Sequence, residues 1–173
     1  MGRLIEFLYT LLRRRHGDEL FMVNGFTLAN AIADKPEDIK RVAADLPPWI
    51  VFVNIAGYER FPEERVTYQE EDVTEIAKQY KCKLLHSVAG VSSYELLKRL
   101  EEPPKDVYWK LKSKGACEEV FFITTLDRVP EFVDYVYHTA TSYGYASTEL
   151  GVYVQPIVQG TSCHLEFDFF YDP

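Results

Sequence analysis

Alternating apolar and polar positions over residues 150–173 predict a two-stranded β-hairpin with one apolar and one polar face. Pairing the strands about Gly160 and Thr161 sorts the side chains into two sets. The apolar face would pair Val152 with Phe169, Val154 with Phe167, Pro156 with Leu165 and Val158 with Cys163. The polar face would pair Tyr153 with Asp168, Gln155 with Glu166, Ile157 with His164 and Gln159 with Ser162. A slip of one residue would mix the sets, so the clean sorting favours this register.

Helical and strand patterns alternate along the rest of the chain. Apolar spacing and β-prone composition predict strands at residues 19–23, 49–55 and 120–124, with a shorter one at 82–87. Apolar spacing and capping signals predict helices at residues 2–16, 34–45, 67–80, 92–102 and 127–143. Two strand–helix–strand units followed by a hairpin indicate an α+β fold, with a ferredoxin-like antiparallel sheet and helices on one face. Residues 57–115 would be a helical insertion between the two halves.

Composition limits the class of protein. The chain has 173 residues, of which 47% are hydrophobic, so we expect one domain spanning residues 1–173. A net charge of −8 argues against nucleic acid and anionic membrane as partners. Three cysteines without CxxC spacing fit a reducing compartment, and the N-terminal apolar run resembles neither a signal peptide nor a membrane span. These features predict a cytoplasmic protein.

The polar face of the hairpin carries candidate chemistry. His164, Glu166 and Asp168 alternate on one strand, so their side chains point the same way. Two interpretations remain open: the three groups bind a metal or move protons, or they are the solvated face of a half-exposed sheet. Periodicity alone favours the second. Pro156 favours function somewhat, because a proline within a strand implies an edge or a bulge, and bulges gather near functional sites.

Several familiar signatures are missing from the sequence. It contains no GxGxxG, GxxxxGK[ST], GxSxG or HExxH motif, so a self-contained nucleotide-binding or hydrolytic site is not expected. Asn24 and Gly25 follow a predicted strand, where a simple turn is the plainer interpretation.

Two segments carry a resemblance to a known family. The stretch LIEFLYTLLRRRHGDELFMVNGFTLANAIA and the stretch GVYVQPIVQGTSCHLEFDFFYDP resemble the substrate-side cap domain of FAD-linked oxidoreductases of the vanillyl-alcohol oxidase and 4-cresol dehydrogenase type. In that family the cap is an α+β domain whose sheet faces the substrate, and a separate domain holds FAD. The resemblance implies that this chain lacks the flavin-binding domain and is a fragment or a subunit that needs a partner.

The resemblance implies a cap for the oxidation of an alcohol, phenol or hydroxy acid. On that hypothesis we expect the polar face of the hairpin to supply the site, with Tyr153 and His164 catalytic. Substrate contacts are expected from Gln155, Glu166, Gln159, Asp168 and Asn24. No residue of this chain is expected to bind the cofactor. A related branch binds a metal through a GHLGDGNLH-like motif. Here the corresponding stretch QPIVQGTSCH keeps only His164 and has Ile157 seven residues earlier, so we expect no metal.

Two other classes of protein remain as alternatives. The first is a stand-alone ferredoxin-like module that binds a small molecule and forms a homodimer through its sheet. In that case the polar face of the hairpin would be buried between subunits. The second is a small heme-free monooxygenase of the dimeric α+β barrel kind, which would be active alone.

Overall fold

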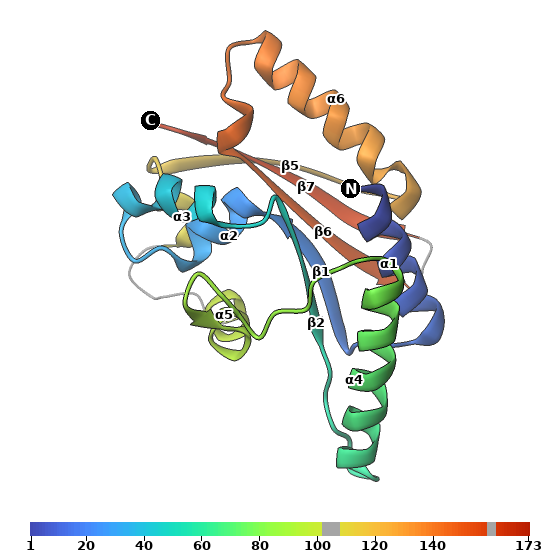
Figure 1. Ribbon diagram of the computed structural model, residues 1–173. Coiled ribbons are helices and arrows are strands. Elements are labelled where there is room, and N and C mark those ends of the chain that lie inside the picture. Colours follow the sequence, from blue (N-terminus) through green and yellow to red (C-terminus); the bar gives the residue numbers. More distant parts are fainter. Residues whose placement is uncertain (102–107, 159–161) are drawn as a thin grey trace.

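A five-stranded antiparallel sheet is the centre of the structure (Figure 1). The computed structural model describes residues 1–101, 108–158 and 162–173, without the side chains of residues 100, 101 and 158. The strand order is β2-β1-β6-β7-β5, and every neighbouring pair is antiparallel. The strands are β1 (Glu19–Asn24), β2 (Trp49–Asn54), β5 (Ala116–Thr124), β6 (Leu150–Val158) and β7 (Ser162–Tyr171). A small separate hairpin consists of β3 (Ser87–Val88) and β4 (Val91–Ser92).

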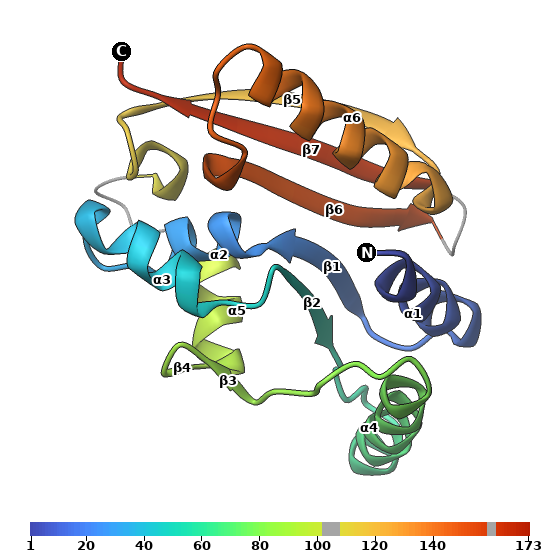
Figure 2. The ribbon, with the colours of Figure 1, turned by 45° about the horizontal axis from the view of Figure 1, so that its top comes forward.

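Three helices cover one face of the sheet: α1 (Gly2–Arg14), α4 (Pro62–Gln79) and α6 (Val129–Ser142). Their apolar sides pack on alternate strand residues, including the fully buried Met22, Val154 and Phe167, because side chains alternate between faces along a strand. In Figure 2, α6 runs along β5 and β7. Among the residues described, no helix has both the length and the apolar character needed to cross a membrane.

A second helical cluster lies on the opposite face. It is formed by α2 (Gly25–Ile32), α3 (Ile39–Asp45), α5 (Ser93–Glu101) and the short 3-10 helix η2 (Trp109–Leu111). Phe21, Val23 and Phe170 point from the sheet into this cluster. The cluster leaves part of the face uncovered, because Phe121 and Ile123 on β5 remain 60% and 61% exposed. Both faces of the sheet therefore carry helices, and the edge strand β5 is left exposed, with Phe121 and Ile123 on the face of the second cluster and Val120 on the other.

The predicted α+β fold with a ferredoxin-like antiparallel sheet is confirmed, but helices lie on both faces of the sheet and not on one. Local details also differ, and the helix predicted to begin at residue 67 begins at Pro62. Helix α2 was not predicted, although it follows β1 directly. Asp34 does not cap the next helix, since α3 begins at Ile39 after the 3-10 turn Pro36–Asp38. The expected strand at residues 82–87 is reduced to the two-residue β3.

The C-terminal hairpin forms with the predicted faces but with a different register. Val152 pairs with Phe167 and Tyr153 with Glu166, two residues away from the predicted partners. Val158 pairs with Ser162, one residue away from its predicted partner Cys163. A register irregularity between Pro156 and Val158 adds the second residue of the shift. Proline lacks the N–H that a ladder needs, which explains a bulge at this point. Because the shift is even from Leu150 to Pro156, the side chains of these residues and of their partners on β7 keep their predicted faces.

Asn24 joins α2 to the sheet. Its Oδ1 accepts hydrogen bonds from Thr27 N (3.0 Å) and Val152 N (3.2 Å), and its Nδ2 donates to Leu150 O (2.7 Å) and Tyr137 OH (3.1 Å). The ladder between β1 and β6 has only two residue pairs, so these bonds satisfy buried groups of β6 that β1 does not reach. Asn24 therefore serves as both a helix cap and a continuation of the sheet.

Replacing Asn24 by alanine removes the cap and leaves buried partners unsatisfied. We expect Asn24→Ala to lower the free energy of unfolding by about 2 kcal/mol. Urea denaturation measures this change, and Asn54→Ala at the end of β2 is the matched control, expected to stay within about 0.5 kcal/mol of the parent protein. A loss of the same small size at Asn24 would contradict the structural role given to this residue.

Candidate functional site

A cavity of about 460 Å³ lies between the partly covered face of the sheet and the α5 and η2 segment. Residues from β1, α2, β6 and β7 form one wall, and a residue of α5 together with residues 108–110 forms the other. The lining consists of Glu19, Phe21, Val23, Thr27, Tyr153, Gln155 and Glu166 from the sheet side, and Leu97, Tyr108, Trp109 and Lys110 from the other side. Its size suits a small molecule.

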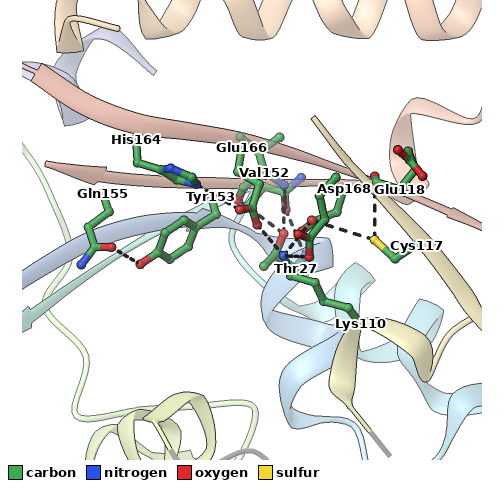
Figure 3. Close-up of polar contacts among 12 residues, drawn as sticks. Thr27, Lys110, Cys117, Glu118, Val152, Tyr153, Gln155, His164, Glu166 and Asp168 are labelled. Atoms are coloured by element: carbon green, nitrogen blue, oxygen red, sulfur yellow. Dashed lines mark hydrogen bonds and ion pairs between the residues drawn. The ribbon is translucent and has the colours of Figure 1, made fainter. Parts of the chain in front are cut away.

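The Lys110 ammonium is buried among three carboxylates. Its Nζ lies 2.5 Å from Glu166 Oε1, 2.6 Å from Glu119 Oε1 and 3.0 Å from Asp168 Oδ1. The Lys110 side chain is 7% exposed and that of Asp168 is fully buried. Figure 3 shows Lys110 extending from η2 to these strand residues. Since an ammonium has three N–H groups, each carboxylate can take one of them.

The electrostatics of this cluster follow from burial and charge pairing. Burial opposes the charged form of Lys110, but hydrogen bonds to Glu119 and Glu166 outweigh it and raise its pKa. Burial is also the largest influence on Asp168 and raises its pKa to about 6, against the attraction of Lys110. For Glu166, burial is outweighed by hydrogen bonds from Lys110 and His164, which lower its pKa. Asp168, whose side chain is fully buried, is thus easier to protonate than Glu166.

A glycine opposite Asp168 makes room for its carboxyl group. A Cβ on Gly151 would come within 2.8 Å of Asp168 Cβ, 2.9 Å of Asp168 Oδ2 and 3.0 Å of Thr27 Oγ1. Asp168 Oδ2 is buried and has no hydrogen-bond partner among the described residues. An unpaired buried oxygen disfavours the ionised form, which is consistent with the raised pKa of Asp168.

Tyr153 presents a neutral hydroxyl at the cavity. Burial, followed by the negative charges of Glu166 and Glu19, raises its pKa to about 12. The hydroxyl donates a hydrogen bond to Gln155 Oε1 at 2.9 Å, and the ring lies 5.7 Å from that of Phe21. Tyr153 can therefore donate a hydrogen bond to a ligand oxygen, but it does not ionise near neutral pH.

His164 lies beside the cavity and is linked to it by Glu166. Its Nε2 is 3.0 Å from Glu166 Oε2, and its ring stacks on Phe121 at 5.4 Å and meets Tyr153 edge to face at 6.1 Å. When the hydrogen is on Nε2, this N–H donates a hydrogen bond to Glu166. Nδ1 then keeps its lone pair and can accept a proton. The carboxylate then orients the imidazole as it does in many acid–base pairs.

The structure brings together most of the residues that the sequence singled out. Tyr153, Gln155 and Glu166 line the cavity, His164 adjoins it, and Asp168 lies beneath it at Lys110. Asn24 is not part of this group, because its polar atoms bond to α2, β6 and α6. Gln159 lies outside the described residues. The roles of these residues toward a substrate stay predictions.

Sequence reasoning missed the residues that complete the site. Lys110 lies within the predicted insertion 57–115, and Glu119 precedes the predicted strand 120–124, which in fact begins at Ala116. No sequence signal points to the contact between Lys110 and Glu166, because 56 positions of the chain separate them. Tyr108 and Trp109 also lie in the predicted insertion, and they form part of a cavity wall.

The three carboxylates have the spacing of a metal site but are paired with an internal cation. Oxygens of Glu119, Glu166 and Asp168 all lie within 4.8 Å of one another. The ammonium of Lys110 contacts each of these residues, so a metal ion there would first have to displace it. The cluster is therefore described as a buried ion-pair network.

Comparisons with known proteins give a fold-level likeness. No protein-family model matches the chain, and no curated protein matches its sequence. A solved structure of alkyldihydroxyacetonephosphate synthase superposes with a TM-score of 0.59 and 10% sequence identity over 97% of this chain. This chain spans only 34% of that protein. At this identity the likeness shows the fold and leaves activity to be argued from the site.

The raised pKa of Asp168 makes stability depend on pH in a defined direction. Its folded-state pKa of about 6 exceeds the usual 3.8, so its contribution to stability is fully present below pH 3.8 and is lost as the pH rises through 6. We expect Asp168→Asn to gain stability relative to the parent protein between these pH values, by on the order of 2 kcal/mol.

Urea unfolding at a series of pH values measures this difference. Asp134→Asn on the exposed side of α6 is the control and should run parallel to the parent protein. A difference between Asp168→Asn and the parent that falls with rising pH would contradict the described environment of Asp168.

Proposed function

We propose that this chain is the substrate-side cap domain of an FAD-linked oxidoreductase that acts on an alcohol, phenol or hydroxy acid. The observation that carries the proposal is the position of the cavity. It lies on the face of the sheet that is only partly covered, so its ligand would be accessible to a companion domain.

The fold likeness is consistent with a domain of a larger enzyme. The similar solved structure is that of alkyldihydroxyacetonephosphate synthase. Nearly the whole of this chain superposes on about a third of that enzyme. This is the relation expected when one domain is compared with a complete enzyme, although 10% identity supports only the general architecture.

The described residues do not themselves fit FAD. The cavity of about 460 Å³ is lined by Glu19 and Glu166, and the carboxylates of Glu119 and Asp168 lie just behind it. A pyrophosphate group prefers backbone N–H groups at a helix N-terminus or unpaired basic side chains. In the proposal another domain or subunit holds FAD, which would accept the hydride, and this chain supplies the walls of the substrate cavity.

An uncovered apolar surface adjoins the cavity. Phe121 pairs with Glu166 and Ile123 with His164, so both apolar side chains lie on the cavity face of the sheet. They are 60% and 61% exposed. Neighbouring large apolar side chains that remain exposed are typical of a surface covered by a partner. A flavin domain seated on β5 and β7 would cover them and close the cavity.

The cavity residues have suitable chemistry for orienting a hydroxyl substrate. Tyr153 remains protonated and can donate to the substrate oxygen, in place of its present bond to Gln155. Gln155 can then accept from the substrate hydroxyl. His164, oriented by Glu166, is the proposed proton acceptor at Nδ1.

A homodimeric binding module is the second candidate function. The same exposed residues Phe121 and Ile123 favour it, because a second copy of the chain could cover them. This candidate differs from the cap domain in what it requires: two identical chains and no flavin.

Flavin content separates the two candidates. We expect the chain produced alone and mixed with FAD to emerge colourless from gel filtration, since its cavity does not fit the pyrophosphate. The protein purified from its natural source should carry FAD, bound by a partner domain or subunit. Flavin absorbance and native mass measure both outcomes.

Two results would contradict the proposal. Stoichiometric FAD on the isolated chain would place the cofactor site here and not on a partner. A natural form without flavin that runs as a dimer, and that Ile123→Lys dissociates, would establish the binding module. Val120→Lys, on the opposite face of β5, is the matched control for that substitution.

A further inference from the structure

Glu166 is held at both of its carboxylate oxygens by groups from different elements. Lys110 Nζ of η2 lies 2.5 Å from Glu166 Oε1, and His164 Nε2 of β7 lies 3.0 Å from Glu166 Oε2. The carboxylate cannot rotate without breaking one of these two contacts. Its orientation toward His164 therefore depends on an ammonium that comes from outside the sheet.

The groups around the His164 ring come from β5, β6 and β7. Its carboxylate contact is Glu166, on its own strand. Its neighbours on the two adjacent strands are uncharged: Phe121 and Ile123 of β5, and Tyr153 and Gln155 of β6. Further titratable groups on this side of the sheet are Glu19, Glu119 and Asp168. These three groups are the same on both sides of each comparison made below, so a difference reports on the residue that is changed.

The two partners of Glu166 act on each other through its charge. A carboxylate beside an imidazole favours the protonated ring, and a protonated ring cannot accept a proton. Lys110 opposes this effect, because it shares the negative charge of Glu166 and disfavours a second cation nearby. For Glu166 itself, burial is outweighed by the hydrogen bonds from Lys110 and His164, which lower its pKa. Glu166 thus stays an acceptor for the Nε2 hydrogen of the neutral ring.

We propose that Lys110 is a positioning residue for His164 and acts through Glu166. It fixes the carboxylate that accepts the Nε2 hydrogen, and it favours the neutral imidazole, in which Nδ1 is free to accept a proton. The inference rests on the proposed function, in which His164 is the proton acceptor. Trp109, the neighbour of Lys110 in η2, forms part of the cavity wall, so the state of the base is tied to the docking of that wall on the sheet.

The ratio of protonated to neutral His164 tests this role. Ring-nitrogen chemical shifts of the full chain with isotope-labelled histidine give the ratio at each pH, and the signals lost in His164→Gln are assigned to this residue. The comparison is made at the pH where half of His164 is protonated in the parent protein. There Lys110→Met should raise the ratio at least about threefold, since a unit charge two hydrogen bonds away has an effect of this size even in a medium as polar as water.

A variant at Glu166 should change the same ratio in the opposite direction. Glu166→Gln removes the carboxylate that favours the protonated ring, so we expect the ratio to fall at least about threefold. A general loss of structure would instead move both variants toward one common value, that of a solvated histidine. Lys112→Met is the matched control, because Lys112 Nζ donates to Ala33 O at 2.7 Å, and its ratio should equal that of the parent.

A second pair of variants gives a result even if Lys110→Met does not fold. Glu119→Gln with Asp168→Asn removes the charges of the other two partners of Lys110 and leaves its contact with Glu166. Lys110→Met is then added to this background, where one carboxylate and not three loses its cation. The addition should raise the ratio at least about threefold here as well.

An unchanged or lower ratio after Lys110→Met, in the parent or in the neutralised background, would refute the role of Lys110. A rise of the same size in Lys112→Met would also refute it, because the ammonium of Lys112 is bonded elsewhere. A fall in the ratio for both Lys110→Met and Glu166→Gln would show a structural effect alone. The measurement uses neither flavin nor substrate, so the flavin content of the natural protein decides the cap role separately.

Discussion

The buried ammonium of Lys110 organises the half of the molecule that contains the cavity. It lies 2.5 Å from Glu166, 2.6 Å from Glu119 and 3.0 Å from Asp168, so one cation links η2 to the paired strands β5 and β7. Trp109, the neighbour of Lys110 in η2, forms part of the cavity wall that faces the sheet. Without the ammonium, the three carboxylates would face one another in a poorly solvated position, and this wall would lose its polar link to the sheet.

The sequence predicted features that depend on local periodicity. Alternation placed Tyr153, Gln155, His164, Glu166 and Asp168 on one face, and this held because the register error was two residues and therefore even. Pro156 correctly pointed to an irregularity in the strand. The N-terminus of α5 was also predicted from the sequence. Ser92 Oγ accepts a hydrogen bond from Glu95 N, as the spacing of these two residues indicates.

The rest depends on contacts between distant parts of the chain. Helix α2 was not predicted, because its residues are buried on all sides and therefore show no amphipathic pattern. The sequence around Asn24 predicts a turn. Only the folded structure shows that Asn24 caps α2 and forms hydrogen bonds to Leu150 and Val152. The pairing of Lys110 with Glu166 has no local signature at all, because tertiary folding alone brings them together.

The two faces of the sheet differ in what they contain: one packs into the main core, and the other lines the cavity. One face is closed by α1, α4 and α6 and provides the main core. The other carries charged and aromatic groups around a cavity, next to the exposed Phe121 and Ile123. The charges of this face are paired internally, because Lys110 contacts Glu119, Glu166 and Asp168. In the proposed function, a companion domain would cover the exposed Phe121 and Ile123 beside them.

The most direct test of this account is the free energy of unfolding of Lys110→Met, measured by urea denaturation beside a variant that also carries Glu119→Gln, Glu166→Gln and Asp168→Asn. The account predicts that Lys110→Met alone loses about 3 kcal/mol or more, and that neutralising the three carboxylates restores a large part of that loss. A loss below about 1 kcal/mol for Lys110→Met, with no recovery in the neutralised variant, would contradict the claim that this ammonium holds the cavity together.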